Sequence, residues 1–128
     1  MSFKHGSTNN TVRNNILCGG RRGAFEFDET ASFNSDNNLV WLADSRAPFA
    51  SNEGTKENFN FAEWKKRMKS DSASLVADPN FANTQGPMFD FHARVAQVSR
   101  LAGPLDVRGD LEGGARQGKS VGVYDTSR

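Results

Sequence analysis

Two short stretches decide the fold of this chain: Asn14-Asn15-Ile16-Leu17 and Asn37-Asn38-Leu39-Val40. The second repeats the first 23 residues later, as an Asn pair followed by two aliphatic residues. Repeats with periods of about 20–50 residues are typical of solenoids, in which each turn of chain buries its apolar side by stacking on the next. The spacing therefore predicts that the two stretches lie one above the other.

The Asn pair has a specific physical use in such a stack. Neighbouring strands lie about 4.8 Å apart, and an Asn side chain carries both an amide donor and a carbonyl acceptor. Identical inward-turned Asn side chains can therefore hydrogen-bond to one another as a ladder. We expect Ile16 to lie over Leu39 and Leu17 over Val40, as an aliphatic stack beneath that ladder.

Composition sets the class of protein. The chain has 128 residues, 36% of them hydrophobic, which suits one domain. Asn, Gly and Phe are abundant, and together they favour short strands joined by tight turns. No apolar run approaches the ~20 residues of a membrane span. A net charge of +1 gives no electrostatic reason to expect a nucleic-acid or membrane partner, and one Cys excludes an internal disulfide.

The chain divides into a flexible polar segment, 1–10, and a single β domain, 11–128. Residues 43–58, which include Pro48 and Gly54, are expected to form a loop. Short apolar pieces bounded by Gly, Pro or Asp predict strands within 11–18, 24–28, 34–42, 74–81, 88–93, 98–103 and 119–124.

One helical excursion is expected near residues 60–70. Asn60 is a good N-cap, and Glu63 three residues later approximates a capping box. Three apolar residues at helical spacing share one face: Phe61, Trp64 and Met68. The spacing favours Trp64 as a packing anchor over a sugar-stacking platform.

The later segments carry a family resemblance. They are the stretch 71–81 with its Ala77-Asp78-Pro79, then Asp90-Phe91, Ser99-Arg100-Leu101-Ala102-Gly103 and Val121-Gly122-Val123-Tyr124. In this order they resemble the C-terminal coils of right-handed parallel β-helix proteins related to polysaccharide lyases and glycoside hydrolases. The resemblance implies an all-β fold, a short right-handed parallel β-helix (a solenoid) with the helical excursion near 60–70.

The chain also departs from that family. Arg100 stands where the family usually has Pro, and Val123 stands where Ala is common. Family members are much longer, and their catalytic residues and calcium ligands lie on central coils to which nothing here corresponds. No catalytic residue is therefore carried over, and the resemblance favours a module without catalysis.

Charged side chains on the first two strands are the candidate site. In a β-helix, outward side chains of stacked strands line a shallow groove that can bind an extended glycan. The groove candidates for acid–base work on a uronate sugar are Arg13, Glu26 and Asp28. The alternative interpretation is ordinary surface charge. Further candidates for ligand binding are Arg21, Arg22 and Trp41.

No metal or cofactor is expected. His92 should face outward beside an inward Phe91, and its spacing to Asp90 matches no metal-binding pattern. Residues 113–120 formally match a phosphate-binding loop, but no apolar strand precedes them and only eight residues follow. Cys18 is expected to be a buried structural residue at a strand end.

The leading hypothesis is a carbohydrate-associated β-helix module, non-catalytic or a truncated lyase-like domain. One alternative is a small polysaccharide lyase or glycoside hydrolase, and another is a self-assembling structural or interaction protein.

The expected partners are a polysaccharide and, because the first coil would expose unpaired strand edges, either a second copy in a homo-oligomer or the missing coils of a longer β-helix. The tail 104–118 is expected to close the opposite end. The N-terminus lacks a signal peptide, which predicts a cytoplasmic protein as written, whereas the resemblance implies secretion for full-length relatives.

Overall fold

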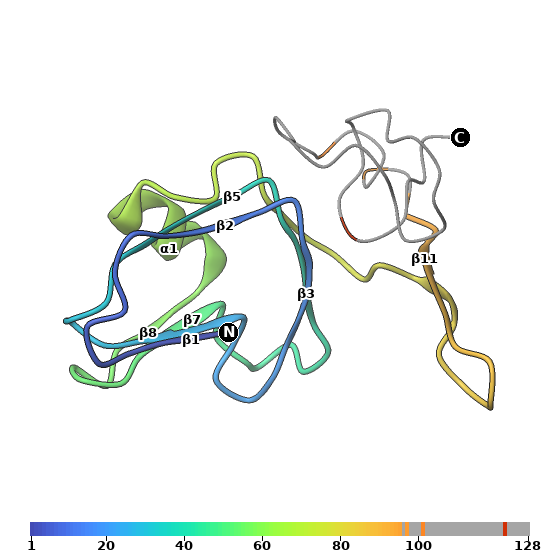
Figure 1. Ribbon diagram of the computed structural model, residues 1–128, viewed down its shortest axis with the longest axis horizontal. Coiled ribbons are helices and arrows are strands. Elements are labelled where there is room, and N and C mark those ends of the chain that lie inside the picture. The colour runs from blue at the N-terminus through green and yellow to red at the C-terminus, as the bar shows by residue number, and fades with distance from the viewer. Residues whose placement is uncertain (96, 98–100, 102–121, 123–128) are drawn as a thin grey trace.

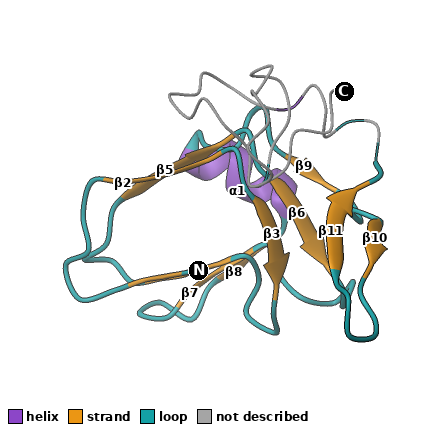
Figure 2. Ribbon diagram, turned by 45° about the vertical axis from the view of Figure 1, so that its right-hand side comes forward, coloured by secondary structure: helices purple, strands orange, loops and turns teal. Residues whose placement is uncertain are grey.

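The computed structural model describes residues 1–95, 97, 101 and 122. Within these residues the chain forms eleven short strands and the helix α1 (Phe61–Met68). The strands make small sheets with both parallel and antiparallel pairs, so the described fold is strand-rich, as expected from the composition (Figure 2). No described helix has the length and apolar character needed to cross a membrane.

The strands form four sheets. The first has the order β1 (Ser2–Phe3), β4 (Phe25–Phe27), β7 (Ala50–Asn52) and β8 (Asn58–Phe59). The second pairs β2 (Asn10–Arg13) with β5 (Phe33–Asp36). The third has the order β3 (Ile16–Gly19), β6 (Leu39–Leu42) and β9 (Leu75–Val76). The fourth is an antiparallel pair, β10 (Phe81–Asn83) and β11 (Asp90–Ala93).

The predicted register between the two Asn repeats is confirmed. β3 and β6 are parallel, with Ile16 opposite Leu39 and Leu17 opposite Val40. β2 and β5 pair in parallel with the same displacement, and β1, β4 and β7 pair in parallel in chain order. Figure 1 shows these three ladders on three sides of a common interior. Strands from successive passes of the chain therefore lie side by side.

A left-handed residue makes the corner between two of these sides. The sequence suggested one continuous strand over 11–18, but the structure divides it into β2 and β3 at Asn14, whose φ is 60°. Asn37, with a φ of 55°, makes the same corner between β5 and β6. Asn tolerates this conformation better than other residues with a β-carbon, because its short polar side chain can bond locally. The repeat therefore encodes a corner as well as a ladder.

The predicted Asn ladder is confirmed at the second member of each pair. The Oδ1 atom of Asn38 accepts from the backbone N of Asn15 at 3.0 Å and from its Nδ2 at 3.2 Å. The Nδ2 of Asn38 donates to the carbonyl of Val12 at 2.9 Å and to Oγ of Ser35 at 3.1 Å. Asn38 is completely buried, so these four bonds meet the requirement that a buried amide be fully paired.

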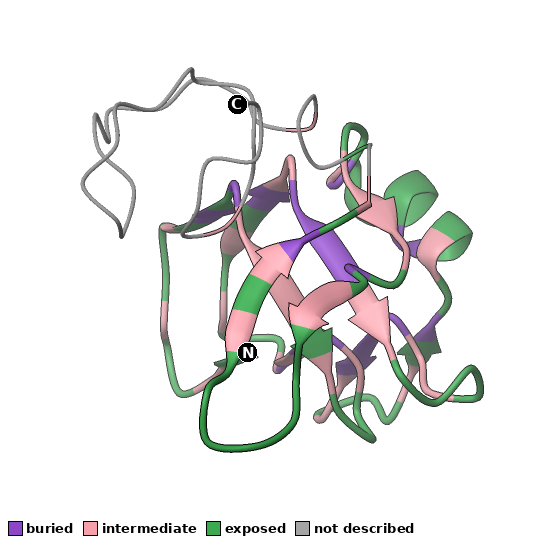
Figure 3. Cartoon of the chain, turned by 90° about the vertical axis from the view of Figure 1, so that its right-hand side faces the viewer, coloured by how far each residue is buried: buried purple, intermediate pink, exposed green. Residues whose placement is uncertain are grey.

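Trp64 is the centre of the aromatic core, which confirms its expected role as a packing anchor. Its side chain is 1% exposed. Five phenylalanine rings lie with their centroids within about 6 Å of the indole: Phe25, Phe27, Phe33, Phe49 and Phe59. The expected capping box is also present, because Asn60 accepts from the N of Glu63 while the Glu63 side chain accepts from the N of Asn60. α1 thus closes the interior on the side of Trp64, and Figure 3 shows its outer turns exposed.

A buried carboxyl group fastens α1 to the ladders. Asp71 is completely buried. Its Oδ2 accepts from Nε1 of Trp64 at 2.8 Å. Its Oδ1 accepts from Oγ of Ser35 at 2.8 Å and from Oγ of Ser74 at 2.6 Å. Because Ser35 lies on β5, Asp71 connects the helix, the second sheet and the turn that leads into β9.

Two segments differ from their sequence-based expectation. The loop predicted over 43–58 is wrong in part, because β7 and the first residue of β8 lie inside it. β7 reads Ala-Ser-Asn, which has little strand propensity, and its pairing with β4 supplies what the local sequence lacks. Within the N-terminal segment predicted to be flexible, β1 pairs in parallel with β4. The predicted strands at 98–103 and 119–124 and the tail 104–118 lie outside the described residues, apart from Leu101 and Gly122.

Candidate functional site

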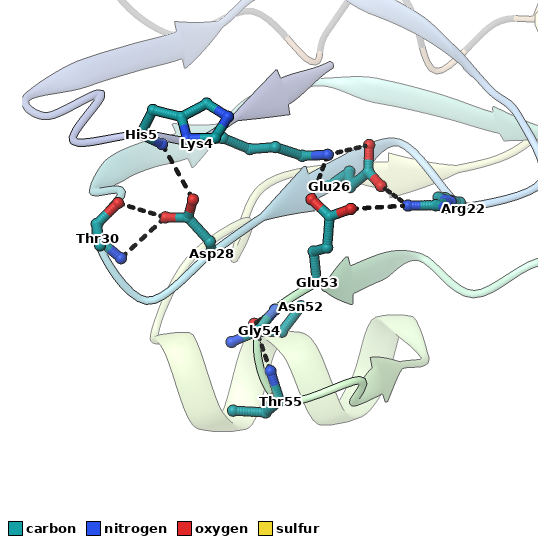
Figure 4. A network of polar contacts seen from close by, with 10 residues as sticks. All are labelled: Lys4, His5, Arg22, Glu26, Asp28, Thr30, Asn52, Glu53, Gly54 and Thr55. Atoms are coloured by element: carbon teal, nitrogen blue, oxygen red, sulfur yellow. Dashed lines mark hydrogen bonds and ion pairs between the residues drawn. The ribbon is translucent and has the colours of Figure 1, made fainter.

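Four charged side chains form a closed ring on the outer face of the first sheet (Figure 4). On β4, Phe25 and Phe27 are buried while Glu26 between them turns outward. The Nζ of Lys4 lies 3.1 Å from Oε2 of Glu26 and 2.5 Å from Oε2 of Glu53. Arg22 closes the ring with ion pairs to the other carboxylate oxygens of Glu26 and, at 3.5 Å, of Glu53. The ring therefore alternates two cations with two anions.

The ring holds all four groups in their charged forms. The hydrogen bond from Arg22 and that from Lys4 lower the pKa of Glu26. The pKa of Glu53 is lowered chiefly by its hydrogen bond from Lys4. In return, the bond to Glu53 raises the pKa of Lys4, and the bond to Glu26 raises that of Arg22. A carboxyl group that acts as a general acid needs a raised pKa, and a lysine that acts as a general base needs a lowered one. The shifts therefore disfavour Glu26 and Glu53 as acids and Lys4 as a base near neutral pH.

We predict that this ring contributes stability that acid removes. Because the folded-state pKa values of Glu26 and Glu53 lie below the usual 4.5, the contribution is complete above that value and is lost as the pH falls through the lowered pKa values. The difference in unfolding free energy between the wild type and the double variant Glu26→Gln/Glu53→Gln should be present at pH 7 and shrink toward zero near pH 2. Urea unfolding across this range measures it, and a difference that does not change with pH would contradict the prediction.

A hollow of about 310 Å³ opens beside the ring. Its lining combines the ring members Arg22, Glu26 and Glu53 with residues from the β7–β8 hairpin and the preceding loops. The other lining residues are Arg21, Pro48, Ser51, Asn52, Lys56 and Asn58. Two of these, Arg21 and Lys56, are exposed cations that form no ion pair with any described residue. Since both carboxylates are already neutralised by Lys4 and Arg22, the hollow presents excess positive charge.

The structure brings some of the predicted site residues together and separates others. Arg21, Arg22 and Glu26 line the same hollow. Asp28 follows β4 but belongs to a different group of bonds. Its carboxylate accepts from the hydroxyl of Thr30 at 2.6 Å, from the N of Thr30 at 2.9 Å and from the N of His5 at 3.0 Å, and these bonds, that of the hydroxyl first, lower its pKa.

The other two predicted residues lie on other sheets. Arg13 is the last residue of β2, opposite Asp36 of β5, and Trp41 is on β6, opposite Cys18 of β3. Neither is among the residues that line the hollow. The proposed acid–base trio of Arg13, Glu26 and Asp28 is therefore not assembled around one cavity.

Sequence reasoning missed Lys4, Glu53 and Lys56. Lys4 lies in the segment that the sequence predicts to be flexible, and the other two lie in the segment that it predicts to be a loop. The signal that could have found Lys4 and Glu53 was the repeat itself. Phe3 pairs with Phe27, and Phe27 pairs with Asn52. These displacements of 24 and 25 residues are close to the 23 of the Asn repeat, so applying the repeat to this sheet would have placed residues near 4 and 53 beside β4.

Two side chains differ from their predicted placement. Cys18 is exposed rather than buried, because its position on β3 alternates outward from Leu17. Its pKa is nevertheless raised, by desolvation first and by the charge of Asp78 second. Phe91 is 46% exposed rather than inward, and its ring contacts those of Phe81 and Phe89. His92 Nδ1 lies 2.5 Å from Oδ1 of Asp90, and the described residues contain no group of three or more His, Cys, Asp or Glu side chains placed to hold a metal ion.

Comparison with known proteins adds no relative. No protein-family model, no curated protein and no solved structure matches the chain. The geometry and charge of the hollow are therefore the features that indicate a function.

Proposed function

We propose that the chain is a non-catalytic, carbohydrate-associated module, built as a short right-handed parallel β-helix, that binds an anionic polysaccharide of the uronate class. The parallel ladders β1–β4–β7, β2–β5 and β3–β6–β9 support the β-helix, because successive passes of the chain return to the three sides in the same order. The observation that carries the function is a pair of cations in the hollow beside the ring, Arg21 and Lys56, that form no ion pair with any described residue.

The charge distribution favours a carboxylate-bearing ligand. A guanidinium presents paired N–H donors that match a carboxylate in a bidentate fashion, and Lys56 adds a second positive charge to the same hollow. The ring contributes rigidity, since Arg22 and Lys4 are each shared by two carboxylates. A repeating uronate offers one carboxylate per sugar, which supplies negative charges for both Arg21 and Lys56.

The same geometry supports binding over turnover. A retaining or inverting glycosidase needs one carboxyl group with a raised pKa to protonate the leaving oxygen. Glu26 and Asp28 both have lowered pKa values, held there by Arg22 and by Thr30 respectively. A glycoside hydrolase that uses Glu26 or Asp28 as its general acid is therefore less well supported than the module.

We predict that neutralising the two free cations weakens binding of an oligogalacturonate about tenfold, which corresponds to ~1.4 kcal/mol. The variant is Arg21→Gln/Lys56→Gln, in which the side chains keep a polar end and lose their charge. Its matched control is Lys65→Gln/Lys69→Gln, which removes two positive charges on α1 and at its C-cap, neither of which lines this hollow. Isothermal titration calorimetry at low and high salt measures the affinities, and the wild-type affinity should fall with salt because the contacts are exposed.

Three results are decisive for this test. The fully methyl-esterified oligomer, which is neutral, should bind much more weakly than the acid form. Equal losses in both double variants, or equal affinity for the two oligomers, would contradict a specific carboxylate site. Release of new reducing ends or unsaturated products by the wild type would favour the enzyme.

A second candidate is an interaction protein that associates through strand edges. The observation in its favour is that β1 and β2 each lie at the end of a described sheet, so that further backbone pairing is geometrically open there. Association without any glycan affinity would favour this candidate over the module.

A further inference from the structure

One C-terminal residue lies against the first corner of the ladders. The N of Gly122 donates to the carbonyl of Asn14 at 2.9 Å. Gly122 is also close to Ile16: a β-carbon placed on this glycine would lie 3.0 Å from Cδ1 of Ile16. A residue more than a hundred positions later in the sequence therefore contacts both the corner and the first residue of β3.

This contact repeats the geometry between the two Asn corners. The N of Asn14 donates to the carbonyl of Asn37 at 3.1 Å, in the same sense as Gly122 donates to Asn14. All three residues are left-handed, with φ values of 90° for Gly122, 60° for Asn14 and 55° for Asn37. Gly122, Asn14 and Asn37 thus form one column of corners joined by successive N–H to carbonyl bonds. Gly122 occupies the position that the corner of a preceding coil would take.

A second C-terminal residue strengthens the assignment. The Nδ2 of Asn37 donates to the carbonyl of Leu101 at 3.0 Å, and Leu101 packs on the small apolar cluster of Leu39 and Ala93, which Ile16 also contacts. Two separate C-terminal residues therefore bond to the two corners of the column.

We propose that Gly122 is a cap in cis: it occupies the exposed corner of the first coil at Asn14 and Ile16, and thereby keeps a second copy of the chain from adding there. A strand added to the β3 edge would need the Asn14 carbonyl and the space above Ile16, and Gly122 takes both. This capping role affects assembly and does not depend on the glycan site.

The test uses the full chain with Gly122→Val. Valine cannot adopt a φ of 90° without strain, and its side chain would collide with Ile16, so the cap should be displaced. The matched control is Gly86→Val, because Gly86 has a similar φ of 80° but nothing within 4 Å of its β-carbon position. Multi-angle light scattering over a dilution series should give the chain mass of 14.0 kDa for the wild type and the control, and a mass about twofold higher for Gly122→Val.

A second measurement keeps the proposal falsifiable if the variant misfolds. In the wild type, the Gly122 amide should exchange with deuterium at least about tenfold more slowly than the Gly86 amide, because it is hydrogen-bonded to Asn14. A Leu39 amide that stays protected in Gly122→Val would show that the ladders persist, since this amide donates to Asn15. Equal exchange of the two glycines in the wild type, or a folded Gly122→Val at the chain mass, would overturn the proposal.

Discussion

Replacing Asp71 by Ala is expected to lower the free energy of unfolding by roughly 3–5 kcal/mol. Three donors converge on this buried carboxyl group, from Trp64, Ser35 and Ser74. Leaving a buried donor without an acceptor costs about 1–3 kcal/mol each, and the bond that Ser35 accepts from Asn38 does not replace the acceptor of its hydroxyl. The φ of 55° at Asp71 adds a strain of about 1 kcal/mol for Ala. Urea unfolding at pH 7 measures the loss.

Two further variants separate the backbone contribution from the hydrogen bonds. Asp71→Gly accepts the positive φ but still removes the acceptor, so most of the loss should remain. Asp71→Asn tolerates the same backbone and keeps one carbonyl oxygen, so it should cost least of the three. Asp44→Ala is the control at an exposed carboxylate, where a change within about 0.5 kcal/mol is expected. If Asp71→Gly were as stable as the wild type, the three bonds would not be fastening α1 to the ladders.

Much of the ladder could be predicted because its information is local and repeated. The Asn pair followed by two aliphatic residues specifies a corner and a register at once, and both occurrences paired as expected. α1 was predictable for the same reason, since Asn60 and Glu63 make a capping box within one turn. The handedness of the stack and its kinship to longer β-helix proteins remain predictions from resemblance.

The first sheet and the site were less accessible to sequence reasoning. β7 has weak strand propensity and forms because β4 lies beside it. The ring joins Lys4, Glu26 and Glu53, which are far apart in sequence and meet only after three passes of the chain. The predicted acid–base trio is not gathered in one place, because Arg13 lies on β2 and Glu26 on β4, which belong to different sheets. Charge pattern alone carries no such three-dimensional information.

The second prediction with a large expected effect is an engineered disulfide between β3 and β6, which should form almost completely or not at all. Cys18 and Trp41 are opposite each other in the parallel register, and neighbouring strands lie about 4.8 Å apart, within the ~4.4–6.8 Å between α-carbons that a disulfide requires. Trp41→Cys should therefore form an intramolecular disulfide with the exposed Cys18 on mild oxidation. The matched control is Leu42→Cys, one residue further along the strand, whose side chain alternates to the other face.

This cross-link tests the central structural claim, parallel strands displaced by 23 residues, most directly. Intact-mass spectrometry after oxidation at mildly alkaline pH, where more of the Cys18 thiol is ionised, measures the loss of two hydrogens in the monomer. We predict that this loss is nearly complete in Trp41→Cys and absent in Leu42→Cys. Equal cross-linking in the two variants, or disulfides only between molecules, would contradict the register.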